Sequence, residues 1–149
     1  MRKVELTAFD LAQRYVGIRE RMGEDDHPLI RWWHSLTTYG EADDEVPWCS
    51  SFVNGVCWEL RLPRSKSAAA RSWLAVGRAV DLSQAAIGFD VVVLKRGMSP
   101  TAGHVGFYAG KAEMDDMNHV QILGGNQGNA VAVAPFPTSA VLGVRRLQD

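Results

Sequence analysis

The stretch VPWCSSFVNGVCWEL, residues 46–60, contains both cysteines of the chain and predicts one helix over about 48–60. Apolar side chains recur in it every three or four residues, which is the spacing of a buried helical stripe. Cys57 lies in the middle of this stripe, where a free cysteine is interpreted as a core residue. Cys49 lies instead at the start of the helix, directly after Trp48. The stripe consists of Phe52, Val53, Val56, Cys57 and Leu60.

The position of Cys49 at the start of the helix is compatible with a reactive thiol. At a helix N-terminus the unpaired backbone N–H groups and the helix dipole favour an anion, and they can lower the pKa of a thiol below its usual value of about 8.5. The same N–H groups can hold the oxyanion that forms when a thiolate attacks a carbonyl. Two interpretations of Cys49 stay open at this point: a nucleophile, or a small residue packed under Trp48.

A thiolate nucleophile needs an imidazole partner, and the chain has 4 histidines. His104 begins the alternating segment GHVGFYAG, in which Gly103 and Gly106 permit close approach of backbone or substrate. By alternation His104 and Tyr108 share an uncrowded face, opposite an apolar set that is predicted to face the core. The other histidines are predicted to cap a helix or to lie on the surface; they are His27, His34 and His119.

Cys–His catalysis usually includes a third polar group, which fixes the tautomer and the orientation of the imidazole. The segment ILGGNQGN, residues 122–129, ends the strand that follows His104 in a Gly-rich bend. Asn126 can be the orienting amide or simply a turn residue, and both interpretations stay open. For Asn129 we prefer the turn.

Four helices are expected in the first half of the chain. The first, over about 7–16, begins with a cap formed by Thr7 and Asp10. The second, over about 28–36, follows His27 and has Pro28 in its first turn. The third is the helix over 48–60, and the fourth covers about 67–77 and ends at Gly77. Trp32, Trp33 and Trp58 are interpreted as core residues.

The second half of the chain reads as strands, so the predicted fold class is α+β. Five short β-branched segments, separated by Gly, Pro and Asn, predict an antiparallel, strongly bent sheet. The fourth strand is predicted at an edge because it contains Pro135 and Pro137. Residues 111–118 are predicted to form an exposed hairpin loop. The five segments are FDVVVLKR, GHVGFYAG, HVQILGG, AVAVAPF and VLGVRRL.

Length and composition limit the possible classes of protein. A chain of 149 residues predicts one domain over 1–149, with a helical part over about 5–77 and a sheet part over about 89–147. The net charge of −1 argues against a nucleic-acid partner or a polybasic membrane anchor.

No apolar run approaches the roughly 20 residues that span a bilayer. Polar residues interrupt the N-terminal segment where a signal peptide would have its apolar core. Cys49 and Cys57 lie about 12 Å apart along one helix, so we expect free thiols.

Several segments, in this order, resemble the CHAP-type amidohydrolase/peptidases, and in particular the small single-domain branch found among phage endolysins and related cell-wall hydrolases. They are PWCSSFVN, ARSWL, FDVVVL, GHVGFYAG and ILGGNQGN, and the resemblance covers about residues 5–147. This family belongs to the wider NlpC-like, papain-like group. The resemblance implies a helix that carries the cysteine, packed on an antiparallel sheet that carries the histidine.

The resemblance also implies residue roles. Cys49 matches the family's nucleophile, His104 its general base and later acid, and Asn126 its third polar residue. Many members have a carboxylate just before that residue, but here Gly124 and Gly125 occupy those positions. Gln127 is therefore a possible substitute as the orienting group. We also assign Gln127 and Trp48 to substrate binding, with Trp73 and Tyr108 as further candidates for lining the groove.

Some relatives bind calcium through acidic residues ahead of the cysteine, and this chain has Glu41, Asp43, Asp44 and Glu45 there. A calcium site needs six to eight oxygen ligands around a tight turn. A solvated acidic loop over the cleft is the preferred interpretation, so we predict no metal and no cofactor.

The expected function is hydrolysis of an amide bond in bacterial peptidoglycan, by a monomer made in the cytoplasm that acts on the cell wall after release or delivery. A phage endolysin is the first interpretation. The alternatives are a secreted bacterial toxin that acts on peptidoglycan or on a protein, and a non-catalytic binding or virion structural module.

Overall fold

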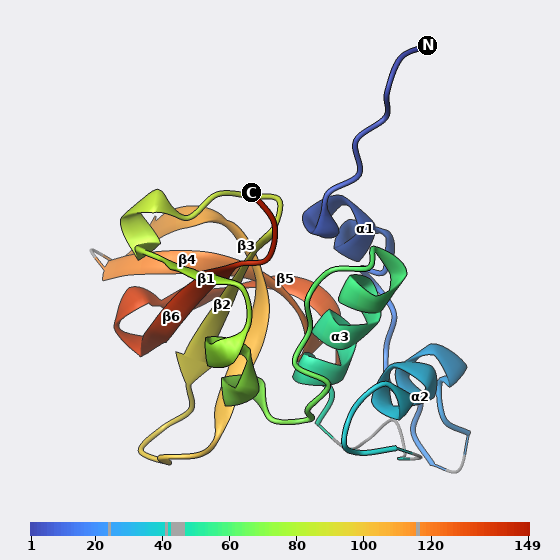
Figure 1. Ribbon diagram of the computed structural model, residues 1–149. Coiled ribbons are helices and arrows are strands. Elements are labelled where there is room, and N and C mark those ends of the chain that lie inside the picture. Colours follow the sequence, from blue (N-terminus) through green and yellow to red (C-terminus); the bar gives the residue numbers. More distant parts are fainter. Residues whose placement is uncertain (24, 41, 43–46, 116) are drawn as a thin grey trace.

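The computed structural model describes residues 1–23, 25–40, 42, 47–115 and 117–149. Within these ranges helices come first and strands afterwards, and Figure 1 shows α1, α2 and α3 gathered beside the sheet. The predicted mixture of helices and an antiparallel sheet is confirmed. The helices are α1 (Ala8–Arg14), α2 (Pro28–Ser35) and α3 (Cys49–Glu59), with the 3₁₀ turns η1 (Ala70–Ala75), η2 (Leu82–Gln84) and η3 (Thr138–Ala140). The strands are β1 (Arg78–Val80), β2 (Asp90–Lys95), β3 (Gly103–Met114), β4 (Met117–Gln127), β5 (Ala130–Pro137) and β6 (Val141–Arg146).

In the described part of the chain, one antiparallel sheet of 6 strands has the order β1-β6-β2-β3-β4-β5. The five predicted strands are β2 to β6, and β5 lies at an edge, as its prolines predict. The prediction missed β1, because three residues are too few to show an alternating pattern. The loop predicted over 111–118 was too long, since β3 continues to Met114 and β4 begins at Met117.

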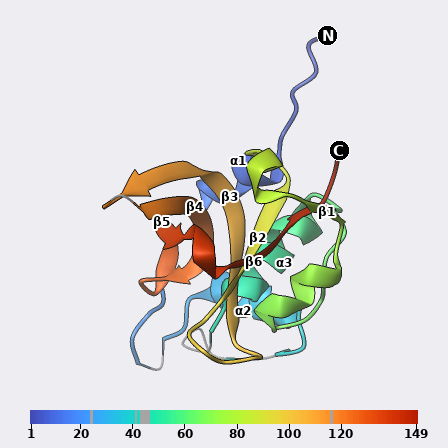
Figure 2. The same cartoon turned by 90° about the vertical axis from the view of Figure 1, so that its left-hand side faces the viewer.

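Apolar side chains cover both faces of the sheet. On the helical side, α1, α2 and α3 pack with residues such as Val105, Phe107 and Leu123 in the larger cluster. On the other side, Tyr108, Ile122 and their neighbours form a second cluster, which Phe136 helps to cover. Figure 2 looks from the sheet side, with α2 and α3 behind the strands. The predicted division of β3 into two faces is therefore confirmed.

The first two helices begin as the sequence predicts. The Thr7 hydroxyl accepts a hydrogen bond from the Asp10 N–H at 3.1 Å, and the Asp10 carboxylate accepts one from the Thr7 N–H at 3.0 Å. His27 caps α2 through its Nδ1 atom, which accepts a hydrogen bond from the Leu29 N–H at 3.1 Å. These side chains satisfy N–H groups that have no partner inside the helix.

The helix α3 is buried on all sides over Cys49–Cys57, rather than along one stripe. Its polar residues are accommodated by hydrogen bonds to the chain around it. The Ser50 hydroxyl donates to the Ser67 carbonyl at 2.7 Å and accepts from the indole N–H of Trp73 at 2.9 Å. The Asn54 carbonyl oxygen accepts from the Lys66 N–H at 2.9 Å. The segment that follows α3 thus wraps the helix that begins with Cys49.

Three local predictions were wrong. His34, predicted on the surface, is buried with its Nδ1 atom 2.7 Å from the Ser51 hydroxyl, because α2 packs against α3 there. Trp58, predicted in the core, is 50% exposed, because it lies past the buried part of α3, where its ring packs edge-to-face with that of Trp32. The predicted fourth helix is the short 3₁₀ turn η1.

No helix in the described ranges is long and apolar enough to cross a membrane.

Candidate active site

Cys49 is the first residue of α3 and is 7% exposed. The backbone N–H groups of Ser50 and of Cys49 itself act on its thiol, as the helix start predicts. The backbone N–H of Val105 also acts on the thiol, and Val105 follows His104 in β3. Tertiary packing therefore brings the start of α3 beside the strand segment that carries the histidine.

Burial outweighs the helix start in the electrostatics of Cys49. It raises the pKa of the thiol above its usual value, while the N–H of Val105, the charge of Arg96 and the N–H groups of the helix start oppose this rise. The expectation of a lowered pKa is therefore not met in this structure. A buried, water-poor environment disfavours the thiolate more than the local donors favour it.

His104 is the second residue of β3 and is 2% exposed. The face that it shares with Tyr108 was predicted to be uncrowded, and this prediction was wrong. The imidazole stacks on Phe136 from β5, with 5.2 Å between ring centroids. Gly103 and Gly106 serve close approach of the backbone: a Cβ at Gly103 would lie 2.8 Å from the Leu94 carbonyl oxygen, and one at Gly106 would lie 2.9 Å from that of Leu123.

The hydrogen bonds of Gln127 assign the tautomer of His104. The Gln127 amide nitrogen donates to the carbonyls of Ile122 and Ala132, at 3.0 and 2.7 Å. The Gln127 Oε1 atom therefore faces His104, 2.9 Å from its Nε2 atom, and accepts a hydrogen bond from it. The Nε2 atom carries the proton, and Nδ1 keeps a lone pair that can accept one.

A bulge in β4 explains why Gln127, and not Asn126, contacts the imidazole. Gly124 pairs with Ala132, and the next pair is Gln127 with Ala130, so β4 advances three residues while β5 advances two. Asn126 adopts a left-handed conformation with φ of 58°. Strict alternation would put position 126 on the face of Gly124, but the extra residue transfers that place to Gln127. Between the two candidates from the sequence, the geometry favours Gln127.

Gly124 and Gly125 leave room on the two sides of this bulge. A Cβ at Gly124 would lie 2.6 Å from the Gln127 Oε1 atom and 3.2 Å from the His104 Nε2 atom. A Cβ at Gly125 would lie 2.7 Å from ring atoms of Trp48. The lack of a side chain at Gly124 therefore leaves the space that the Gln127 amide uses.

Trp48, assigned to substrate binding, has no exposed surface in this structure. Its ring stacks on Trp33 at 6.0 Å, and its indole N–H donates to the Glu20 carboxylate at 2.8 Å. Trp73 is also fully buried, and Tyr108 belongs to the second core cluster. All three rings are therefore buried in the structure, with Trp48 and Trp73 in one core cluster and Tyr108 in the other.

The electrostatics of His104 predict an uncharged pair at neutral pH. Burial lowers the pKa of the imidazole to about 4; the hydrogen bond to Gln127 opposes this shift, and the charge of Arg96 adds to it. Because burial also raises the pKa of the Cys49 thiol, the ground state is thiol and neutral imidazole, not thiolate and imidazolium. His104 would then act as a base when substrate is bound.

Two further residues, Tyr39 and Arg96, interact electrostatically with the thiol, and neither was among the residues predicted for the site. Tyr39 lies close enough for the thiolate charge of Cys49 to add to the rise that burial causes in the pKa of its phenol. Arg96 extends from the end of β2, with its Nη2 atom 3.5 Å from the His104 Nδ1 atom. Arg96 lies shortly before the GHVGFYAG segment, and this closeness in the sequence could have indicated that it lies near His104. No pattern in the sequence indicated Tyr39.

Other predicted residues lie elsewhere. Asn129 has φ of 62° in the turn between β4 and β5, in agreement with the turn interpretation. The predicted acidic loop, with Glu41, Asp43, Asp44 and Glu45, falls outside the described residues, so a calcium site there stays untested.

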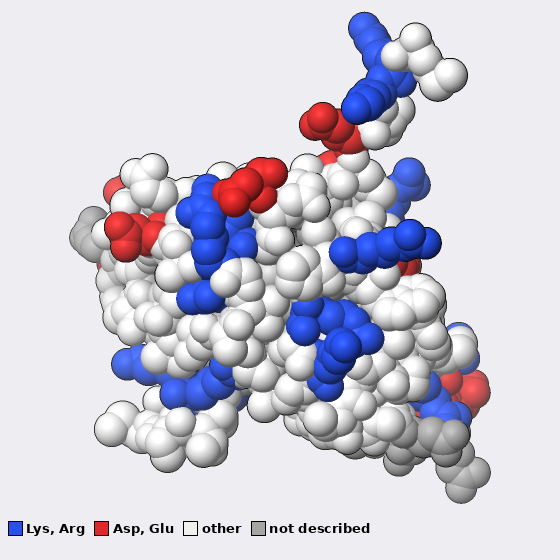
Figure 3. Space-filling model, in the orientation of Figure 1, with Lys and Arg blue, Asp and Glu red and all other residues white. Residues whose placement is uncertain are grey.

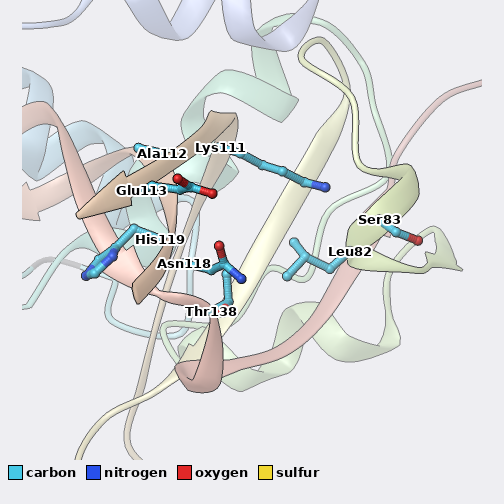
Figure 4. A pocket seen from close by; sticks show the side chains of 8 residues that line it. All are labelled: Leu82, Ser83, Lys111, Ala112, Glu113, Asn118, His119 and Thr138. Carbon is cyan, nitrogen blue, oxygen red and sulfur yellow. The ribbon is translucent and has the colours of Figure 1, made fainter. Parts of the chain in front are cut away.

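A separate cavity of about 450 Å³ lies at the far end of β3 and β4. Figure 4 shows Lys111 reaching across it from one side, with Leu82 and Ser83 on the other. His119 is among its lining residues, but its ring points away from the centre and its Nδ1 atom lies 3.0 Å from the Met117 carbonyl. None of the lining residues belongs to the Cys49–His104 region.

The sequence matches no family model and no curated protein. The fold is similar to that of a solved structure, NlpC1 from Trichomonas vaginalis, with a TM-score of 0.53 and 14% sequence identity. The match covers 94% of this chain and 42% of the other, so this chain corresponds to less than half of that protein. At this identity the similarity concerns the fold alone, and the protein has an NlpC-like fold.

Proposed function

We propose that this protein is a cysteine-dependent hydrolase that cleaves an amide bond in bacterial peptidoglycan. The observation that carries the proposal is the hydrogen bond of 2.9 Å between His104 Nε2 and Gln127 Oε1. It leaves the His104 Nδ1 atom as a proton acceptor, on a strand whose next residue, Val105, has a backbone N–H that acts to lower the pKa of the Cys49 thiol. A nucleophile, a base and an orienting group on three separate elements are the parts that covalent amide hydrolysis requires.

The proposed reaction has two steps. The Cys49 thiol transfers its proton to His104 Nδ1 as its sulfur attacks the amide carbonyl, and N–H groups at the start of α3 hold the oxyanion. The C–N bond then breaks, and the amine leaves with the proton from Nδ1. In the second step Nδ1 takes a proton from water, the hydroxide attacks the thioester, and the released sulfur recovers the proton. Gln127 holds the imidazole ring throughout.

Two observations support a cell-wall substrate. The ordered motifs around Cys49 and His104 resemble the CHAP-type, papain-like cell-wall hydrolases, and the fold is similar to that of a protein named NlpC1. Within this proposal the bond is the N-acetylmuramoyl–L-alanine amide or a peptide bond of the stem or cross-bridge. A phage endolysin is the first biological setting. A bacterial toxin that acts on peptidoglycan or on a protein is the second.

The test is mass spectrometry of purified peptidoglycan after digestion by the wild type, by Cys49→Ala and by Cys57→Ala. Cys57 is the matched control, because it is a buried thiol of the same helix whose pKa burial raises strongly. We expect new fragments from the wild type and Cys57→Ala, and none from Cys49→Ala. A free lactyl-muramic group would identify the amidase reaction, and a new peptide terminus an endopeptidase.

Fragments from Cys49→Ala would contradict Cys49 as the nucleophile. If all three digests leave peptidoglycan intact, while an alkylating agent modifies Cys49 and leaves Cys57 unmodified, the thiol is reactive but the substrate is different. The protein-directed toxin would then become the leading proposal.

A further inference from the structure

The loop between β2 and β3, residues 96–102, is held in place beside the candidate site. Arg71 from η1 donates to the Ala102 carbonyl at 2.9 Å and to the Ser99 carbonyl at 2.8 Å. The Ser99 hydroxyl accepts a hydrogen bond from the Ala102 N–H at 2.9 Å inside the loop. Arg96 is the first residue of this loop and directly follows β2, so the strand on one side and the hydrogen-bonded loop on the other hold its backbone in place.

The guanidinium of Arg96 has an unusual set of contacts for this protein. Arg145 and Arg146 donate to backbone carbonyls, and Arg146 also to the buried Asp90 at 2.7 Å. Arg96 contacts the His104 Nδ1 atom at 3.5 Å, and within the described ranges no carboxylate pairs with it. A guanidinium has five N–H donors in a planar fork that matches a carboxylate, so most of its donors remain available.

The surroundings of Arg96 favour an anion. Its Nη2 atom lies 3.5 Å from the His104 Nδ1 atom, and its charge lowers the pKa of His104 and opposes the rise in the pKa of Cys49. Figure 3 shows Lys and Arg side chains at the base of the β2–β3 loop, at lower left, with no acidic side chain beside them on this face. Since His104 is uncharged at neutral pH, the guanidinium is the fixed positive charge next to the pair.

We infer that Arg96 binds a free carboxylate of the substrate, so that the preferred substrate carries a carboxylate next to the amide bond that is cleaved. This inference rests on the proposed function for its reaction, but the carboxylate contact can be measured without it. Stem peptides of peptidoglycan carry such carboxylates, whereas an uncharged peptide of equal shape lacks them. Arg96 is thus a specificity-determining residue of the candidate site.

The first experiment compares the alkylation of Cys49 by iodoacetate and by iodoacetamide, with the modified residue identified by peptide mapping. The two reagents differ in their carboxylate. The ratio of the two rates is measured for the wild type, for Arg96→Gln and for Lys95→Gln. Lys95 is the matched control, an exposed neighbouring cation for which the structure gives no contact with His104.

We expect the iodoacetate to iodoacetamide ratio to fall about fivefold in Arg96→Gln, which is what a unit charge about 4 Å away contributes in water. In Lys95→Gln the ratio should stay within about twofold of the wild type. An unchanged ratio in Arg96→Gln would overturn the inference. If both rates change by the same factor, Arg96 acts on the thiol and not on the carboxylate; if neither rate changes, Arg96 acts on neither.

The second experiment uses two peptide substrates that differ only in a carboxylate or a carboxamide next to the scissile amide. The wild type should cleave the carboxylate peptide with the higher kcat/KM, and Arg96→Gln should lose this preference. Equal cleavage of both peptides by the wild type would overturn the inference and leave the proposed function intact. If neither peptide nor peptidoglycan is cleaved while the alkylation ratio depends on Arg96, the proposed function fails and the carboxylate site stands.

Discussion

Two neighbouring glycines of β4 face two different regions of the molecule. Gly124 lies against the hydrogen bond between His104 and Gln127, and Gly125 lies against the ring of Trp48 in the core. Both regions need a residue without a side chain, but for different reasons. One glycine leaves room for a polar contact of the candidate site, and the other leaves room for close packing of the helices on the sheet. Substitutions at these two adjacent positions should therefore affect different properties: the orientation of the His104 imidazole at Gly124, and the stability of the fold at Gly125.

The largest effects are expected from alanine at these two positions. In Gly125→Ala the new methyl group would lie 2.7 Å from the Trp48 ring and 2.8 Å from the Phe52 Cβ atom, so we expect a loss of about 1–3 kcal/mol in the free energy of unfolding. In Gly124→Ala the new methyl group would displace the Gln127 amide from its hydrogen bond to His104, so we expect a smaller loss of stability, about 0.5–1.5 kcal/mol, while kcat/KM falls at least about tenfold. Thermal unfolding and peptidoglycan digestion measure the two quantities. Equal loss of stability in both variants would contradict the separation of the two regions.

A smaller effect, about tenfold in kcat/KM, is expected from Gln127→Ala, because the imidazole loses the acceptor that fixes its tautomer. Asn126→Ala is the matched comparison, since Asn126 lies next to Gln127 in the bulge, while the hydrogen bond to the His104 Nε2 atom comes from Gln127. That variant should keep its activity and lose about 1 kcal/mol of stability, because φ of 58° is unfavourable for alanine. If the activity losses were reversed, the orienting role would belong to Asn126.

The smallest effects concern pH. His104 must be unprotonated to act as a base, so the acid limb of the pH profile of kcat/KM should lie near its pKa of about 4 rather than near 6.5. Gln127→Leu should move the limb to lower pH, because the hydrogen bond to Gln127 raises this pKa. Arg96→Gln should move it to higher pH, because the charge of Arg96 lowers the pKa. A limb near pH 6.5 in all variants would contradict the burial of the imidazole.

The same shift predicts how stability depends on pH. The folded protein holds the His104 pKa at about 4, below its ordinary value of 6.5, so between these values the unfolded chain binds the proton more readily. The contribution is complete above pH 6.5 and is lost as the pH falls toward 4. His104→Gln should show a weaker fall of the unfolding free energy over this window, as measured by chemical denaturation.

Much of the fold could be read from local patterns. The cap of Thr7 and Asp10, the start of α2 at Pro28 and the alternation of β3 depend on residues a few positions apart, and each agrees with the structure. Two of the wrong assignments, buried His34 and exposed Trp58, depend on which elements pack around the side chain. Helical spacing gives the face of a residue but not the neighbour that covers it.

The sequence by itself determined that helices precede an antiparallel sheet, that Cys49 begins a helix, and that His104 begins a strand, because periodicity and helix-start signals are local. Only the tertiary structure decided that Gln127 contacts His104, because a one-residue bulge changes the face of every residue after it. It also decided the direction of the pKa shifts, since burial from distant segments outweighs the local field of the helix. The placement of Arg96 beside the pair likewise depends on the β2–β3 hairpin, which no local pattern fixes.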